Sequence, residues 1–272
     1  MSQRQHVGAH HRTLRISYAQ SLSQRLYGYV LIPALVLLGT VFLIHQFAGA
    51  SPTHAITFST VLWALCSTFG RLWVAYCLAL LVSIPLGILV THNALAERIF
   101  LPFFDILQSL PVLAFFPVII VFFIHWGMVN AAAIFILFVT MLWNIVFSLV
   151  GGLHSIPEDI QNAGRIFGLR HLAYIDKILL PAAVPYLITG SLLAWAQGWN
   201  IVIVAEVLHT YIPGSTSSAD LFGIGSLLVN SASAGDQQTF LVSIAVMIVA
   251  IAILNLFVWQ KLLHYAERYK FE

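Results

Sequence analysis

One polar segment, residues 151–185, separates two strongly apolar stretches and carries most of the chain's internal charge. Its residues predict two short helices joined at Gly168, a residue type suited to a left-handed helix end. A capping box of Ser155 and Glu158 is expected to begin the first helix. Pro157 fits the first turn because its missing N–H costs little there. The chain is therefore constrained to leave its apolar surroundings and fold in water at this point.

Each predicted helix of this hairpin has an apolar face. In the first helix, the helical spacing places four apolar residues on one side: Ile156, Ile160, Ala163 and Phe167. The second helix carries on one side Leu172, Ile175 and Leu179, and Pro181 and Pro185 punctuate the return. An ordinary cytoplasmic loop with an interfacial helix would show a similar pattern. We favour a docking element for a partner, because a helix that enters a groove needs an apolar stripe and a rigid turn.

The composition places this hairpin in a membrane protein. Hydrophobic residues make up 60% of the chain and charged residues 8%, with a mean hydropathy of +0.92. A soluble domain carries about 25% charged residues, so this chain cannot cover a water-facing surface. No cleavable signal peptide is evident in the polar first 26 residues. The predicted fold class is all-α and polytopic, with about six transmembrane helices and a cytoplasmic helix-turn-helix.

Six apolar spans are expected along the chain. They cover residues 27–45, 71–90, 107–124, 131–150, 186–208 and 240–259, and Pro111 and Pro117 are expected to interrupt the third. Residues 46–70 are interpreted as partly interfacial, and residues 209–238 as a loop rich in Gly and Ser. With the N-terminus inside, every Lys and Arg except Arg71 falls on the cytoplasmic side, as positive charge does in membrane proteins. Both termini and the hairpin are therefore expected in the cytoplasm.

The hairpin also resembles a cytoplasmic loop of the importer-type ABC permeases. That family's motif is Glu-Ala-Ala, three residues, Gly, nine residues, Ile, one residue and Leu-Pro. The matching positions here are Asn162, Ala163, Gly164, Gly168, Ile178, Leu180 and Pro181. Asn162 stands where the family has Glu and Gly164 where it has Ala, while Glu158 and Asp159 supply acids one turn earlier. The resemblance implies that these nine residues couple the chain to an ATPase.

Three further stretches resemble the nitrate, sulfonate, taurine and bicarbonate branch of this family. They are LQSLPVLAFFPVIIVFF at 107–123, VAEVL at 204–208, and Gly223-Ile-Gly225 followed by Gly235-Asp236. The resemblance implies a permease core at 58–265 with its coupling loop at 151–185, an additional N-terminal helix at 27–48 and a basic cytoplasmic tail at 1–26.

The resemblance further implies a multi-pass subunit of the bacterial inner membrane that imports a small anion such as nitrate, sulfonate, taurine or bicarbonate. Its partners would be cytoplasmic ABC ATPases, which bind ATP and Mg, a second permease protomer and an external solute-binding protein. No cofactor is expected in this chain, which has no ATP-binding P-loop, and no nucleic acid partner. The eleven histidines predict no metal site, because those in the tail have no acidic or thiol partner.

Polar and aromatic residues inside the spans are candidates for the translocation pathway. They are Arg71, Gln108, Asn144, Trp195, Gln197, Trp199, Asn200 and Glu206. Glu206 shares a helix face with both tryptophans and could line a gate, but it could equally reach water or pair with Arg71. Arg71 is expected to snorkel at the outer end of its span, with attraction of an anion as the alternative. Helix–helix hydrogen bonding explains the amides as well as solute contact does.

Two other functional classes compete with the ABC importer. A secondary transporter driven by an ion gradient would favour several buried ionisable groups and an internal repeat, and the sequence shows one acid inside a span and no evident repeat. An intramembrane enzyme would need a nucleophile–base pair or metal ligands inside the spans, and none is visible. We therefore predict a non-enzymatic permease, and copurification with an ATPase would separate it from both rivals.

Overall fold

The computed structural model describes residues 58–157, 159–160, 162, 166–167, 174–212 and 216–267. Within these ranges the regular structure is helical, so the all-α prediction is confirmed. The α-helices are α3 (Phe58–His92), α4 (Ala94–Ser109), α5 (Val112–His125), α6 (Val129–His154), α9 (Leu180–Glu206), α10 (Ile224–Ser233), α11 (Gln237–Leu254) and α12 (Gln260–Ala266). Two π-helical segments, Ile175–Leu179 and Asn255–Trp259, lead into α9 and α12, and a 3-10 turn covers Ser217–Ala219.

Four helical stretches are long and apolar enough to cross a membrane. They are Phe58–His92, Val129–His154, Lys177–Glu206 and Gln237–Ala266. The pair formed by α4 and α5 adds a fifth span if it is counted as one, although it bends by 89°. The polytopic prediction is therefore confirmed for the described part of the chain. The expected first span and the basic tail lie outside it.

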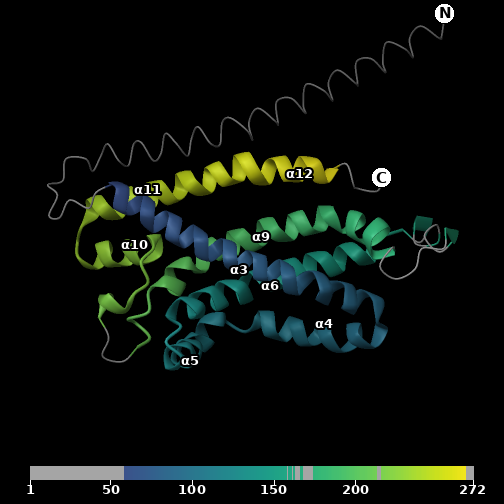
Figure 1. Ribbon diagram of the computed structural model, residues 1–272, viewed down its shortest axis with the longest axis horizontal. Coiled ribbons are helices and arrows are strands. Elements are labelled where there is room, and N and C mark those ends of the chain that lie inside the picture. Colours follow the sequence, from purple (N-terminus) through teal and green to yellow (C-terminus); the bar gives the residue numbers. More distant parts are fainter. Residues whose placement is uncertain are drawn as a thin grey trace, which may run out of the picture.

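Helix α6 is the centre of the bundle and packs along both α3 and α9. Figure 1 shows these helices and α11–α12 lying along the long axis, with α10 at one end. We call this the α10 end, and we call the opposite end, where α6 stops and α9 starts, the hairpin end. Small residues let the central helices approach closely: a Cβ on Gly190 would lie 2.8 Å from the Ser148 Cβ, and one on Gly198 would lie 2.9 Å from Leu72 Cδ2.

The second span is longer than predicted. Helix α3 begins at Phe58, so residues 58–70 are part of a continuous helix and not of an interfacial one. Val61, Ala64, Thr68 and Leu72 recur at helical spacing and are all buried, which explains why the helix extends through this region. Arg71 consequently lies well inside α3 and not at its end. The predicted fourth span, 131–150, agrees with α6 within a few residues at each end. The predicted sixth span, 240–259, lies inside the longer helical stretch Gln237–Ala266.

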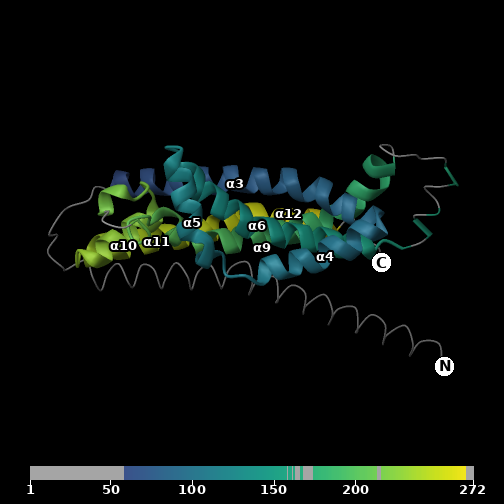
Figure 2. The same cartoon turned by 90° about the horizontal axis from the view of Figure 1, so that it is seen from below.

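The third span is not the single segment 107–124 that was predicted. It consists of α4 and α5, and α5 runs across the direction of the other helices (Figure 2). Pro111 caps α5, and Leu110 before it is extended, with φ −76° and ψ 130°. The bend follows because a proline disfavours the helical conformation of the residue that precedes it. Pro117, the other predicted interruption, lies inside α5 without ending it.

The return from the hairpin is also helical. Ile175–Leu179 runs directly into α9, so the predicted second short helix and the fifth span form one stretch. Pro181 occupies the first turn of α9, where its missing N–H is tolerated, and Pro185 lies inside the helix. The two prolines therefore do not separate hairpin from span. The joint at Gly168 and the position of Leu172 lie outside the described residues.

Candidate functional site

A buried ion pair joins α3 to the last turn of α9 at the α10 end. The Arg71 Nη1 lies 2.5 Å from the Glu206 Oε1. Glu206 is completely buried, and Arg71 is 8% exposed. The expectation that Arg71 snorkels to the outer surface is therefore wrong. It fails because the chain supplies a carboxylate that compensates the guanidinium inside the bundle.

The Glu206 carboxylate accepts two further hydrogen bonds, one from α3 and one from α10. Thr68 Oγ1 on α3 donates to Oε1 at 2.6 Å, and the Gly225 N–H in the first turn of α10 donates to Oε2 at 2.8 Å. The start of a helix carries partial positive charge and free N–H groups, so a carboxylate placed there is stabilised. Ile224 N–H donates to the same Thr68 hydroxyl at 2.9 Å. Glu206 and Thr68 together hold the N-terminus of α10.

The Arg71 guanidinium is satisfied by groups from three other places in the chain. Its Nε donates to Asn130 Oδ1 at the start of α6 (3.2 Å), and its Nη2 donates to Ser67 Oγ (3.1 Å) and to the Phe222 carbonyl (2.6 Å). The Leu221 N–H also donates to the Glu206 carbonyl at 3.0 Å. This set of contacts, which we call the Arg71–Glu206 centre, ties α3, α6, α9 and the start of α10 together.

Two glycines let α10 come this close. A Cβ on Gly223 would lie 2.2 Å from Glu206 Oε2, and one on Gly225 would lie 2.8 Å from the Ile203 Cα. Neither position can accept a side chain unless the carboxylate or the α9 backbone moves. Gly223-Ile-Gly225 was singled out in the sequence only through resemblance. Its physical role is to leave room for the carboxylate against the helix start.

The arrangement of this centre is suited to holding helices and not to proton transfer or solute capture. Both charges are compensated and hydrogen-bonded, which is the condition under which a buried pair is tolerated. Of the two roles left open for Glu206, the structure shows the pairing with Arg71. It does not place the carboxylate at a water-filled surface.

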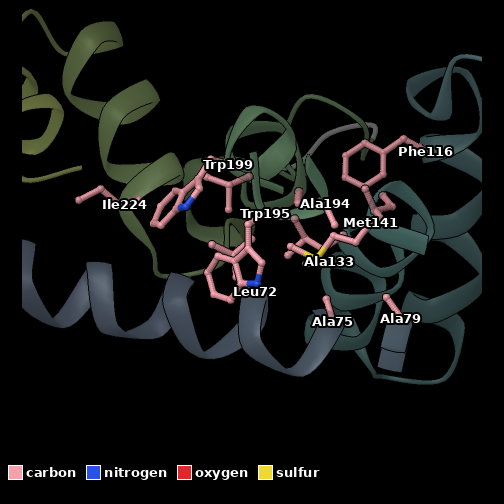
Figure 3. Close-up of a cluster of buried hydrophobic side chains, with 14 of the residues drawn as sticks. Leu72, Ala75, Ala79, Phe116, Ala133, Met141, Ala194, Trp195, Trp199 and Ile224 are labelled. Carbon is pink, nitrogen blue, oxygen red and sulfur yellow. The ribbon is translucent and has the colours of Figure 1, made fainter. Parts of the chain in front are cut away.

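The two tryptophans of the candidate pathway are core residues. Trp195 is 1% exposed and lies with ring centroids 5.3–6.3 Å from those of Phe69, Trp73, Tyr76 and Trp259. Figure 3 shows Trp195 and Trp199 within the buried cluster near Leu72. In the described part of the chain, neither indole N–H has a hydrogen-bond partner. The indoles share a helix with Glu206, but the carboxylate's hydrogen-bond partners come from α3 and α10.

The four amides of the candidate pathway are distributed over three helices. Gln197 and Asn200 are exposed on α9, and Asn144 is half-buried on α6, where its Nδ2 donates to the Thr140 carbonyl at 3.1 Å. Gln108 is exposed near the end of α4, and its Nε2 donates to Asp105 Oδ1 at 3.0 Å. The structure therefore does not gather the eight candidates into one site. It separates a buried group from three exposed amides and the half-buried Asn144.

A second polar cluster, centred on Asp220, was missed in the sequence. Its carboxylate accepts from the backbone N–H groups of Leu208 (2.8 Å) and His209 (3.0 Å), from the His209 ring, and from Asn230 Nδ2 (3.2 Å). Burial raises the pKa of Asp220, but the hydrogen bonds from His209, Asn230 and Leu208 outweigh it, and the net pKa lies below the ordinary value. Asp220 joins the segment after α9 to α10, and the described part of 209–238, which includes α10, is not a simple loop.

The hairpin presents apolar side chains to its surroundings. Ile166 is 83% exposed and Phe167 is 81% exposed, while Ile156 is buried and Ile160 packs against the α6–α9 end of the bundle. The Ser155 hydroxyl donates to the Gly152 carbonyl (2.8 Å) and lies 2.6 Å from the Tyr186 hydroxyl, so it closes the end of α6.

The coupling residues implied by resemblance are only partly described. Asp159 and Asn162 are exposed, whereas Ile178, Leu180 and Pro181 are half-buried where the chain enters α9. The other four coupling residues lie outside the described residues: Glu158, Ala163, Gly164 and Gly168. The predicted capping box includes Glu158, so the structure does not describe it either.

Comparison with known proteins identifies the family to which this chain belongs. Residues 83–266 match the family model described as "Binding-protein-dependent transport system inner membrane component". The nitrate import permease protein NrtB of Leptolyngbya laminosa is 33% identical over 184 residues, 62% of this chain and 65% of that protein. The bicarbonate transport system permease protein CmpB of Synechococcus elongatus is 32% identical over 152 residues, 56% of this chain and 54% of that protein. The matched part thus covers between half and two thirds of these relatives.

The fold has a counterpart among solved structures. A chain of the MetNI methionine ABC transporter, in an inward-facing conformation, superposes with a TM-score of 0.64 at 19% identity, covering 76% of this chain and 96% of that chain. At this identity the likeness concerns the fold. The family model matches more than half of the chain and therefore shows its family. This protein belongs to the binding-protein-dependent transport system inner membrane components.

Proposed function

We propose that this chain is the membrane-spanning subunit of an ATP-driven importer of a small anion of the nitrate and bicarbonate type. The observation that carries the proposal is the family match over residues 83–266 together with the identity to NrtB and CmpB. The bundle of long apolar helices supplies the membrane part. ATP and Mg would bind to separate ATPase subunits, so this chain itself performs no hydrolysis.

The hairpin is the proposed contact with the ATPase. Ile166 and Phe167 are large apolar side chains that are more than four-fifths exposed, and they lie beyond the ends of the spans. Such exposed apolar side chains are suited to a groove on a soluble partner. In this proposal the nine coupling residues named from the family motif form or support this contact. ATP-driven motion of the ATPases would move the hairpin and, through the continuous helix from Ile175 into α9, the bundle.

The exposed amides are the proposed lining of the solute route. Gln197 and Asn200 lie on the exposed side of α9, where contact with lipid would be unfavourable. We assign this side to a second permease protomer and the route between the two, together with Asn144 and Gln108. Arg71, Glu206, Trp195 and Trp199 would shape the route from behind by fixing α10 and α9. An external solute-binding protein would deliver the anion at the α10 end, with the hairpin end and both termini in the cytoplasm.

Copurification tests the proposal. The permease is expressed with the ABC ATPase subunit encoded with it, and the ATPase is measured in the detergent-solubilised complex. Phe167→Ala should lower the recovered ATPase severalfold, because it removes an exposed ring from the contact. Phe257→Ala, the same change at a ring 61% exposed on the Asn255–Trp259 segment, is the matched control and should leave the recovery unchanged. Absence of any ATPase from the wild-type complex would overturn the ATP-driven function, and equal recovery in Phe167→Ala would overturn the hairpin contact.

A further inference from the structure

Helix α4 has two exposed faces of opposite character. On one face the exposed side chains are apolar, namely Leu95, Ile99, Phe103 and Ile106, which are 52–68% exposed. On another face Arg98, Pro102, Asp105 and Ser109 recur at helical spacing; all four are exposed, and all except Pro102 are polar. Gln108 extends this second face. We call it the polar stripe of α4, and the buried Ala96 and Phe104 form the third face, toward the bundle.

The polar stripe runs from the hairpin end into the middle of the bundle. Glu97 Oε1 lies 3.6 Å from His154 Nε2, so α4 starts level with the end of α6. The Phe104 ring lies 5.5 Å from the ring of Trp143, which is near the middle of α6. The rise along the axis of α4 from Ala94 to Asp105 is about 16 Å, at about 1.5 Å per residue. This rise is close to half the thickness of a hydrocarbon core of about 30 Å.

A carboxylate at this depth needs water or a counter-charge. An exposed ionised side chain facing lipid is unfavourable, and such residues mark aqueous paths or polar partners. The Gln108 amide donates one hydrogen bond to Asp105, whereas a carboxylate can accept about four. In the last turn of α4 the Leu107 carbonyl accepts from the Leu110 N–H, and the helical i+4 pairing of carbonyls ends at the break before Pro111. These groups make the end of the stripe a negatively polarised, hydrogen-bond-accepting surface.

We propose that the polar stripe of α4 lines a water-filled vestibule that opens at the hairpin end and ends at Asp105, near the middle of the membrane. The vestibule attracts cations and hydrogen-bond donors and repels anions at its inner end. It rests on the proposed function, because an importer needs an aqueous exit on the cytoplasmic side. An anion on this route would therefore meet an electrostatic barrier at Asp105 in whichever direction it moved.

Cysteine reactivity along α4 tests the vestibule. Cys66 and Cys77 are replaced by Ala, and single cysteines are introduced into the full complex in inside-out membrane vesicles. Ser109→Cys, on the polar stripe, should react with a charged methanethiosulfonate reagent at least about tenfold faster than Ile106→Cys, on the apolar face one turn away, because a thiol ionises only where water reaches it. Gln108→Cys is a second stripe position in case Ser109→Cys assembles poorly, and Ile99→Cys is its apolar control.

Reagent charge tests the role of Asp105. At Ser109→Cys, Asp105→Asn should lower the ratio of cationic to anionic reagent rates by about three- to tenfold, the effect of one charge acting across about 6 Å in water with salt screening. Glu267→Gln, which changes an acid at the end of α12 whose side chain is 61% exposed, should leave the ratio unchanged. Equal reactivity on both faces, or unreactive stripe positions, would overturn the vestibule, and an unchanged ratio would overturn its negative end. Labelling requires neither ATP nor solute, so a complex that shows the pattern but lacks the ATPase would refute the importer and leave the vestibule standing.

Discussion

The Arg71–Glu206 centre makes a quantitative prediction about stability. Glu206→Gln keeps the size of the side chain but removes its charge, which leaves the Arg71 guanidinium buried among neutral acceptors on Asn130, Ser67 and Phe222. Removing one partner of a buried pair costs about 3–5 kcal/mol. Each kcal/mol shifts the melting temperature of a protein of this size by roughly 2–4 °C, so we expect a fall of about 6–20 °C.

A double change separates charge from packing. Arg71→Gln combined with Glu206→Gln removes both charges and should recover at least half of the loss, because no uncompensated charge then remains. Glu97→Gln is the control: its carboxylate is 37% exposed and lies 3.6 Å from His154, and exposed pairs contribute at most about 1 kcal/mol.

The assay is thermal denaturation of the purified complex in detergent, monitored by size-exclusion chromatography of the complex that remains intact after heating. A Glu206→Gln protein that melts within about 2 °C of wild type would refute the reasoning, because it would show that the carboxylate does not compensate Arg71. A double variant less stable than both single variants would also contradict it, because the two residues would then act through separate contacts.

Three further predictions concern the same chain. Gly223→Ala should abolish assembly or strongly reduce it, because its Cβ would collide with the Glu206 carboxylate, whereas Gly70→Ala, which meets no atom within 4 Å, should assemble normally in the same chromatography; normal assembly of Gly223→Ala would contradict the close approach. The pKa of Asp220 is lowered in the folded protein, so the stabilisation by its carboxylate is fully present above the ordinary aspartate pKa and is lost as the pH falls through the folded pKa. Hydrogen exchange at the Leu208 amide should therefore be slower in wild type than in Asp220→Asn at pH 6, and the difference should shrink below about pH 4. A difference that does not depend on pH would contradict this prediction. Gly168→Val should uncouple uptake from ATP hydrolysis or block assembly, since a β-branched residue resists a left-handed turn by about 1–3 kcal/mol, and normal uptake with solute-stimulated ATPase activity would refute the predicted turn.

The membrane class, the helical fold and most spans could be predicted from apolar length alone. The limits of α3 could not, because a charged residue was taken to mark the end of a span. Arg71 lies inside the helix since Glu206, 135 positions later, compensates it. Local periodicity identifies each residue separately but carries no information about pairing between distant positions. The sequence therefore leaves this pairing as one of several alternatives.

Helix α10 was hidden by its composition. Gly and Ser normally indicate a loop, but here Ser226 Oγ accepts from the Gly223 N–H at 3.2 Å and the glycines allow contact with Glu206. Tertiary contacts thus override a weak local preference. Asp105 was overlooked for a related reason, because a third span starting at residue 107 places it in a polar connection. Pro111 correctly predicted an interruption, but only the structure gives the bend of 89° and extends the helix back to Ala94.

Transport in reconstituted vesicles tests the central claim most directly. The permease, its ATPase and its solute-binding protein are placed in proteoliposomes, and uptake of labelled nitrate and bicarbonate is measured with ATP and Mg inside the compartment that the ATPase faces. The account predicts that uptake of at least one of these anions requires both ATP and the binding protein, and that an imposed proton or sodium gradient does not replace ATP. Uptake driven by an ion gradient without ATP would contradict the account and identify a secondary transporter.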